Sequence, residues 1–168
     1  MSDEFVAVYA PRLGQLLIDR GWMFACAESC TGGLLSAAMT DTPGSSQWFD
    51  RGFVTYSNQA KVEQLGVNAD TLERFGAVSE ETAMEMAAGV LAAASLSQLA
   101  ISTTGIAGPD GGTPGKPVGM VCFGFAQRAG QGVVTRAMTK VFEGDRAQVR
   151  SASVAFALRT ALELIEPR

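Results

Sequence analysis

Ser29 is the first candidate for chemistry, because this serine lies in a short polar segment between two apolar runs. The segment, Glu28-Ser29-Cys30-Thr31-Gly32-Gly33, has the composition of a turn from a strand into a helix. A serine hydroxyl in such a turn can act as a nucleophile if a base removes its proton. The chain contains no histidine, so the usual imidazole base is missing. A different side chain would have to serve as the base.

Lysine is the obvious substitute for histidine in this chain. Burial, or a nearby positive dipole, lowers the pKa of a lysine from about 10.4 toward the pH at which an enzyme works. Lys61 follows Ser57-Asn58, a suitable N-cap, and is predicted in the first turn of a helix. Lys116 lies in a glycine-rich segment and Lys140 in a predicted strand. Lys61 is therefore the best candidate for the base, with a solvated surface lysine as the alternative interpretation.

The turn at Ser29 supports other interpretations. Ser29 could simply cap the following helix, with the glycines serving only a tight turn. The backbone amides of Thr31, Gly32 and Gly33 lie at a predicted helix N-terminus, where they could bind a phosphate or an oxyanion. Cys30, directly before them, is a further candidate for binding the oxyanion or the substrate. Cys30 is an alternative nucleophile, although a small core residue is the more usual role of a cysteine in an apolar context. On residue types alone, the cap and the nucleophile both stay open.

A second candidate segment, residues 104–117, contains five glycines and three prolines. A loop of this length and composition is typical of a functional segment rather than a simple connection. Its spacing does not match a Walker A loop, and no G-x-G-x-x-G follows a strand. A flexible glycine linker is the alternative. If the loop is functional, its backbone faces the ligand, with contacts expected at Thr104, Gly105, Ala107 and Gly108.

These segments need a scaffold, and the chain predicts alternating helices and strands. Helices are predicted over 4–20, 33–39, 59–65, 80–94 and 146–165, and strands over 22–27, 49–56, 98–103, 118–127 and 132–142. Ser79 is a predicted N-cap, and Asp145 with Gln148 predicts a capping box. The last two strands form a hairpin. The order predicts an α/β fold, a three-layer α/β/α sandwich with a mixed, mostly parallel sheet containing one hairpin.

Composition limits what the chain can be and bind. With 168 residues, 47% of them hydrophobic, the chain can bury a core as one domain over residues 1–168. The 13 basic and 17 acidic residues give a net charge of −4 without a basic run, so no nucleic-acid partner is expected. The start lacks the pattern of a secretory signal, and no apolar run reaches about 20 residues. A soluble, cytoplasmic protein without a membrane partner is the expectation.

No metal and no cofactor are expected. Without histidine, the ligands of a metal would be carboxylates or thiolates, and neither type clusters in the sequence. Asp110 lies among glycines and could touch a hydrated cation, but one carboxylate is weak evidence for a site. The three cysteines, Cys26, Cys30 and Cys122, lie in apolar segments and are expected to be reduced thiols.

Five motifs, in this order along nearly the whole chain, resemble those of the CinA C-terminal domain family. They are AESCTGG at 27–33, FVTYSNQAK at 53–61, GAVS at 76–79, TGIAGPDGG at 104–112 and GDR at 144–146. The family's enzymes are nicotinamide-nucleotide amidohydrolases. The resemblance implies hydrolysis of the carboxamide of nicotinamide mononucleotide, giving nicotinate mononucleotide and ammonia in pyridine-nucleotide salvage. Longer members of the family carry a further N-terminal domain, which is not expected here.

The resemblance also implies roles for individual residues. The family is understood as serine/lysine hydrolases, so Ser29 and Lys61 would be the nucleophile and the general base. Tyr56 would orient one of these two residues, Thr104 would lie close to the pair, and Arg146 would contact the phosphate. Two other hypotheses remain, a non-catalytic module that binds a nucleotide phosphate and an amidase of broader specificity. A symmetric homodimer is compatible with an apolar domain of this size.

Overall fold

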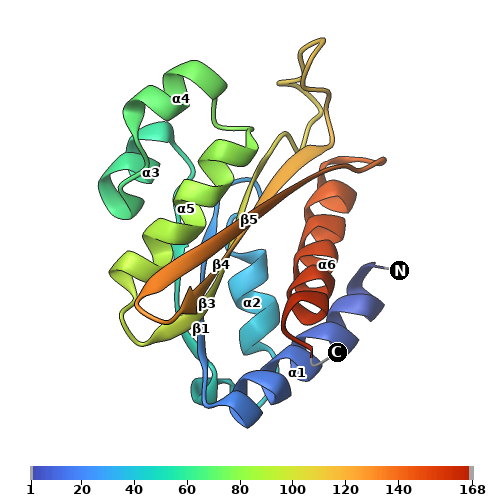
Figure 1. The fold of residues 1–168 in the computed structure, drawn as a ribbon. Helices are drawn as coiled ribbons and strands as arrows, with labels where there is room; N and C mark the ends of the chain where they lie inside the picture. Colours follow the sequence, from blue (N-terminus) through green and yellow to red (C-terminus); the bar gives the residue numbers. More distant parts are fainter. Residues whose placement is uncertain (1, 167–168) are drawn as a thin grey trace.

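A five-stranded mixed sheet forms the centre of the computed structural model, which describes residues 2–166 (Figure 1). The strand order is β2-β1-β3-β4-β5. The strands are β1 (Met23–Glu28), β2 (Phe49–Val54), β3 (Ser97–Gly105), β4 (Met120–Ala129) and β5 (Gly132–Val141). Of these five strands, four run in one direction and β4 runs in the other. The mostly parallel sheet with one hairpin is therefore confirmed.

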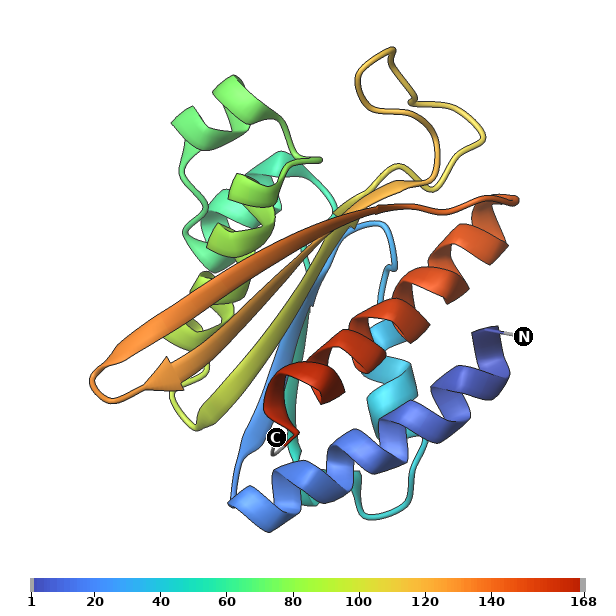
Figure 2. The ribbon, with the colours of Figure 1, turned by 45° about the vertical axis from the view of Figure 1, so that its right-hand side comes forward.

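Helices cover both faces of this sheet, which confirms the predicted three-layer sandwich (Figure 2). The helices are α1 (Ser2–Arg20), α2 (Leu34–Thr40), the 3-10 helix η1 (Ser45–Gln47), α3 (Asn58–Leu65), α4 (Ala69–Phe75), α5 (Glu80–Ala93) and α6 (Arg146–Ile165). On one face lie α1, α2 and α6, and on the other lie α3, α4 and α5. Of the expected domain, only Met1, Pro167 and Arg168 lie outside the described residues.

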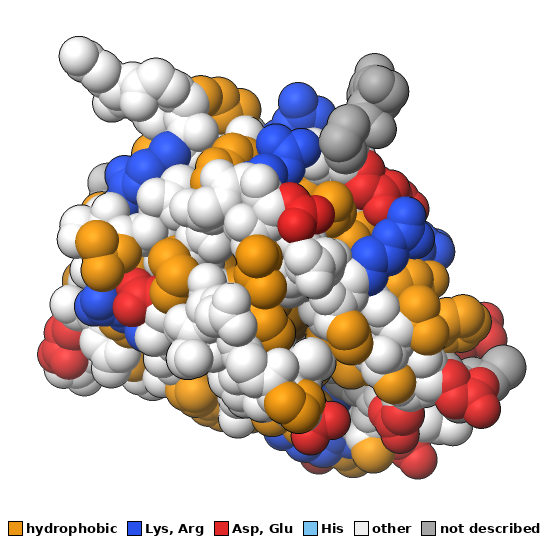
Figure 3. All heavy atoms as spheres, turned by 90° about the horizontal axis from the view of Figure 1, so that it is seen from below, with side chains coloured by type: hydrophobic (Ala, Val, Ile, Leu, Met, Phe, Trp, Pro, Cys, Tyr) orange, Lys and Arg blue, Asp and Glu red, His pale blue; other side chains and the backbone are white. Residues whose placement is uncertain are grey.

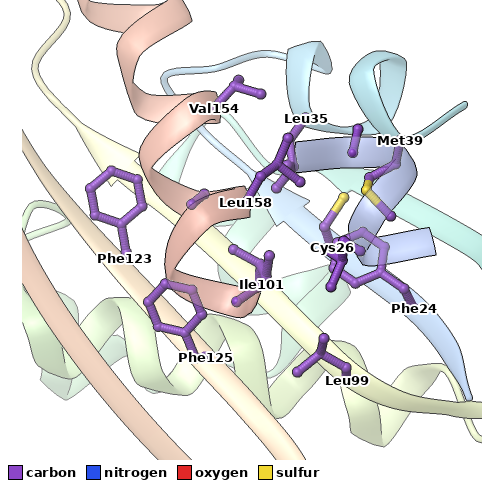
Figure 4. Packing of buried hydrophobic residues seen from close by; sticks show 14 of the residues in the cluster. Phe24, Cys26, Leu35, Met39, Leu99, Ile101, Phe123, Phe125, Val154 and Leu158 are labelled. Atoms are coloured by element: carbon purple, nitrogen blue, oxygen red, sulfur yellow. The ribbon is translucent and has the colours of Figure 1, made fainter. Parts of the chain in front are cut away.

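Alternate residues of β1 point into two separate cores, so both faces of this strand are buried. Phe24 belongs to the larger cluster, with Leu35 of α2, Phe123 of β4 and Leu158 of α6 (Figure 4). Ala25, on the opposite face of β1, belongs to the cluster beneath α5. Burial of apolar surface stabilises the fold by about 25 cal/mol per Å². Both faces of β1 are thereby fixed, and with them the position of the residue that follows the strand.

Three local expectations differ from the structure. β3 continues to Gly105, because Thr104 and Gly105 both pair with β4, so these residues belong to a strand rather than to the loop. Helix α4 was not predicted, because one short segment offers too few turns to show a helical period, although Asn68 caps it with its side chain. Strand β4 ends at Ala129 rather than at residue 127, because the turn of the hairpin comprises only residues 130 and 131.

The register of the sheet brings three strand ends to one edge. Glu28, the last residue of β1, pairs with Val54 of β2 and with Thr103 of β3. The residues that follow these three are therefore neighbours at the carboxyl edge of the parallel strands. In open α/β sheets, this edge is where ligands bind. It is also where the candidate nucleophile lies.

Candidate active site

Ser29 is the residue directly after β1, and its backbone is fixed on both sides. Its N–H donates to the Thr103 carbonyl at 2.9 Å, and its carbonyl accepts the Gly32 N–H at 3.1 Å. Ser29 does not cap α2, because the N-cap is Gly33, which adopts a left-handed conformation with a φ of 106° and makes no side-chain cap. The helix-cap interpretation of Ser29 is therefore wrong. The Ser29 hydroxyl is directed instead toward Lys61 and the end of β2.

Lys61 reaches Ser29 from the first turn of α3. Ser57 caps this helix by accepting the Ala60 N–H, as predicted. The lysine side chain is only 1% exposed, and its Nζ lies 3.0 Å from Ser29 Oγ. Nζ also donates to the backbone carbonyls of Thr55 at 2.9 Å and Tyr56 at 3.1 Å. The structure thus brings the predicted nucleophile and base into direct hydrogen-bond contact.

The surroundings of Lys61 Nζ suit a neutral amine. All three of its hydrogen-bond partners are uncharged, and burial lowers the pKa of Lys61 below its ordinary value. A neutral amine has two N–H groups and one lone pair. The two carbonyls can accept the two N–H groups, which leaves the lone pair for the proton of Ser29. After proton transfer, the resulting ammonium has three N–H groups and can still satisfy all of them.

Glu28 directly precedes Ser29 and anchors the turn, a role that was not predicted from the sequence. This side chain is fully buried. Its Oε1 accepts the Thr31 hydroxyl and the Leu35 N–H, each at 2.7 Å, and its Oε2 accepts the Ser36 N–H at 3.0 Å and the Ser36 hydroxyl at 2.8 Å. Glu28 therefore satisfies the first amides of α2, which has no capping side chain of its own. The sequence did contain a signal for this role, namely a carboxylate, Glu28, close before a turn with two glycines.

A cavity of about 190 Å³ opens over the Ser29–Lys61 pair. Eight of its lining residues were predicted site residues, namely Ser29, Cys30, Tyr56, Lys61, Thr104, Gly105, Ala107 and Arg146. Ala77 and Val78 also line it; their motif was noted, but no role was assigned to them. Thr31, Gly32, Gly33 and Gly108 do not line the cavity. Thr31 instead points into the core, where its hydroxyl contacts Glu28 and Thr103.

Tyr56 contacts Ser29 and Lys61 through its backbone rather than its ring. Its carbonyl oxygen accepts from Lys61 Nζ and lies 3.4 Å from Ser29 Oγ. The side chain is 62% exposed at the rim of the cavity, and its hydroxyl accepts from Arg146 Nη2 at 3.4 Å. Arg146 Nη1 donates to the Gly108 carbonyl at 2.9 Å. Arg146 therefore joins two sides of the rim and keeps further N–H groups available for a ligand.

Cys30 is a poor nucleophile in this structure. Its side chain is 6% exposed, and burial raises the pKa of the Cys30 thiol to about 12. The thiolate is the reactive form of cysteine, so a thiol with this pKa is unreactive near neutral pH. The chemistry of the pair therefore favours Ser29 over its neighbour.

The loop after β3 extends from the site into solvent (Figure 2). The Ile106 N–H donates to the Met120 carbonyl, and the Gly119 N–H donates to the Ile106 carbonyl, so the base of the loop is closed. Thr113 and Lys116 pair near its tip. These bonds argue against the flexible-linker interpretation. Ala107 lines the cavity from the base of the loop, whereas none of residues 108–117 lines it.

Elsewhere on residues 2–166, no other cavity groups a serine and a lysine in the way that the cavity over Ser29 and Lys61 does. A larger cavity, about 610 Å³, lies between α1, α2 and α6 and is lined mainly by apolar side chains. The face seen in Figure 3 carries acidic and basic side chains interspersed with apolar ones. Within residues 2–166, no three His, Cys, Asp or Glu side chains group closely enough to hold a metal ion. No helix in this part of the chain is long and apolar enough to cross a membrane.

Comparisons with known proteins agree with the motifs. The model of the CinA C-terminal domain matches residues 7–165. The chain is 52% identical over 162 residues to the nicotinamide-nucleotide amidohydrolase PncC of Enterobacter agglomerans, and the match covers 96% of each chain. It is 49% identical over 160 residues to the protein of the same name from Escherichia coli strain K12, covering 95% of this chain and 94% of that one.

The solved structures agree as well. The competence/damage inducible protein CihA from Agrobacterium tumefaciens superposes with a TM-score of 0.89 at 41% sequence identity, and the match covers 96% of each chain. Similarity at this level extends over the sheet, both helical layers and the edge that carries the candidate site.

Proposed function

This chain belongs to the CinA C-terminal domain family, and we infer that it is an amidohydrolase that converts nicotinamide mononucleotide to nicotinate mononucleotide and ammonia. The names of its full-length relatives support the reaction, which belongs to pyridine-nucleotide salvage. One observation supports the mechanism. The Nζ of Lys61 lies 3.0 Å from Ser29 Oγ, at the bottom of a cavity that also holds Arg146.

In the first half of the reaction, Ser29 forms an ester with the substrate. Neutral Lys61 takes the hydroxyl proton as Ser29 Oγ attacks the carboxamide carbon. The carbonyl oxygen of the substrate becomes an oxyanion, which backbone amides of the turn after Ser29 stabilise. Lys61 then gives its proton to the amide nitrogen. The carbon–nitrogen bond breaks, and ammonia leaves.

In the second half, water releases the product. Lys61 is neutral again after the departure of ammonia, and it takes a proton from the water that attacks the ester carbon. The bond from carbon to Ser29 Oγ then breaks, and Lys61 returns the proton to Ser29. The product acid loses its remaining proton to solvent and forms the nicotinate carboxylate, and no cofactor takes part.

The rim of the cavity supports recognition of the ribose phosphate. Arg146 uses two of its five N–H groups on Gly108 and Tyr56, so the others can form a charge-assisted contact with a phosphate. Its position at the start of α6 adds the positive end of the helix dipole. The carboxamide would then lie at Ser29 and the phosphate at the rim.

Ammonia release from purified protein tests this function. Nicotinamide mononucleotide, nicotinamide riboside and free nicotinamide would be compared at equal concentrations. We expect kcat/KM for the mononucleotide to exceed that for the riboside by about 10-fold to 100-fold, the range for hydrogen bonds to a charged group. The variant Arg146→Met is expected to remove most of this preference. Equal turnover of all three compounds would support an amidase of broader specificity, and tight binding without ammonia release would support a binding module.

A further inference from the structure

Arg150 reaches the nucleophile turn from behind the cavity. It lies on α6, one helical turn after Arg146, and its side chain is half-buried. Its Nε donates to the Cys30 carbonyl at 3.1 Å, and its Nη2 donates to the Thr31 carbonyl at 3.2 Å. Arg150 does not line the cavity over Ser29. Its contacts are therefore with the backbone of the turn.

These contacts fix the orientation of two peptide groups. In a planar trans peptide, the carbonyl of one residue and the N–H of the next point in opposite directions. By binding the Cys30 carbonyl, Arg150 also orients the Thr31 N–H. By binding the Thr31 carbonyl, it orients the Gly32 N–H, which donates to the Ser29 carbonyl at 3.1 Å. That last bond fixes the peptide group that carries the Cys30 N–H.

The turn therefore leaves one backbone donor available beside Ser29. Among the backbone–backbone hydrogen bonds of residues 2–166, none uses the Cys30 N–H, whereas the Ser29 N–H and the Gly32 N–H are both paired. Cys30 lines the cavity, whereas Thr31 is fully buried. The N–H of the residue after a nucleophile is a common oxyanion donor. The planar guanidinium suits this arrangement, because it binds two carbonyls in a fixed geometry. A Cβ atom at Gly32 would lie 3.3 Å from Nη2, so glycine also permits this close approach.

We propose that Arg150 is a positioning residue for the hydrolysis, one that fixes the nucleophile turn so that the N–H group of Cys30 can bind the oxyanion. This role rests on the proposed function of Ser29. It predicts a specific kinetic effect. Because Arg150 acts on a donor that is used in the transition state and does not itself line the cavity, its loss should lower kcat and leave KM almost unchanged.

Arg128 provides a matched control. It is also a part-buried arginine that binds backbone carbonyls, with Nε on Ser97 at 2.8 Å and Nη2 on Leu91 at 2.6 Å. Arg128 lies near the end of β4 that is remote from Ser29. The variants Arg128→Met and Arg150→Met therefore remove the same charge and a similar number of carbonyl contacts at two distances from the site.

The experiment compares kcat, KM and Tm for the wild type, Arg150→Met, Arg150→Lys and Arg128→Met, with nicotinamide mononucleotide as substrate. We expect Arg150→Met to lower kcat about 100-fold, the cost of a small misplacement of catalytic groups. KM should change less than about threefold, in keeping with the loss of an interaction made only in the transition state. Arg150→Lys should recover part of kcat, and Arg128→Met should lower Tm with kcat intact. If Arg150→Met is too unstable to assay, Arg150→Lys is compared with the wild type and with Arg128→Met instead.

Three results would overturn the proposal. An equal loss of kcat in the Arg128 and Arg150 variants would show a merely structural role. A rise in KM for the mononucleotide that is absent for the riboside would make Arg150 a phosphate contact. An unchanged kcat in Arg150→Met would remove it from catalysis.

A wild type that releases no ammonia would contradict the proposed function instead. The rate at which a fluorophosphonate labels Ser29 then decides the role of Arg150, because this reaction uses the same oxyanion donor; equal rates in all variants would contradict that role.

Discussion

Lys61 Nζ lies 3.0 Å from Ser29 Oγ, although 32 positions separate the two residues in the chain. The parallel pairing of β1 with β2 creates this contact, because it sets the end of β2 and the start of α3 beside the residue after β1. None of the hydrogen-bond partners of Nζ is a carboxylate. In the proposed mechanism, the chain would therefore obtain its base through burial of a lysine, where a hydrolase with histidine would use an imidazole.

The first prediction concerns pH. Burial lowers the pKa of Lys61, and only its neutral form can accept the proton of Ser29. Activity should therefore be low where Lys61 is protonated and rise with pH through its lowered pKa, below the ordinary value of about 10.4. The measurement is kcat/KM for ammonia release across neutral and alkaline pH. A profile with no rising limb would contradict the assignment of Lys61 as the base.

The second prediction separates the backbone of Tyr56 from its ring. The carbonyl contacts Lys61, whereas the hydroxyl contacts only Arg146 at the exposed rim. Tyr56→Phe keeps the carbonyl and should change kcat less than about tenfold, because one exposed hydrogen bond contributes about 1 kcal/mol. Steady-state kinetics with nicotinamide mononucleotide measures this. A loss as large as that of Lys61→Met would show that the hydroxyl itself acts on the pair.

The third prediction concerns Cys30. Burial raises the pKa of its thiol to about 12, so the thiol should be protonated and unreactive at neutral pH. Cys30→Ala keeps the backbone N–H and should retain most of kcat. Treatment of the wild type with iodoacetamide at pH 7 should leave activity intact, with mass spectrometry checking the extent of alkylation. Loss of activity in Cys30→Ala would revive the thiol as the nucleophile.

The fourth prediction concerns the anchor beneath the turn. Glu28→Gln replaces one carboxylate oxygen with an NH₂ group, which faces donors from Leu35 and Thr31 or from Ser36. A buried unsatisfied polar group costs about 1–3 kcal/mol, so the free energy of unfolding should fall by at least about 2 kcal/mol. Urea denaturation measures this free energy of unfolding. Glu63→Gln, on the exposed side of α3, removes the same charge and should leave stability within about 0.5 kcal/mol. Equal stability of the two variants would contradict the anchoring role of Glu28.

Much of the fold could be predicted because capping residues in the sequence indicate where several helices begin. Ser57, Ser79 and Asp145 cap α3, α5 and α6 as the sequence indicates, and Asp145 forms the predicted capping box with Gln148. The burial of both faces of strand β1 is reflected in the sequence by a continuous apolar run. The end of β3 was misplaced, because Gly105 carries a loop signal. Yet a Cβ atom there would lie 2.7 Å from the Met120 carbonyl, so glycine is what lets β4 approach.

The site was only partly accessible to sequence reasoning, because its contacts run through the backbone. Residue types drew attention to Ser29 and Lys61, since a histidine-free chain leaves few bases. No residue type shows that Tyr56 contacts the pair through its carbonyl, and nothing local links Arg150 to a turn about 120 positions earlier. Such contacts depend on tertiary packing, which places α6 beside the start of α2.

The most direct test of the central claim is ammonia release from nicotinamide mononucleotide by Ser29→Ala, Lys61→Met and Lys61→Arg, with circular dichroism as the control for folding. Arginine stays protonated at all accessible pH values, so Lys61→Arg keeps a cation but cannot accept a proton. We predict that all three variants fold and that each loses at least about 1,000-fold in kcat, as expected when one member of a nucleophile–base pair is removed. Activity close to wild type in a folded Ser29→Ala or Lys61→Arg protein would contradict the Ser29–Lys61 mechanism.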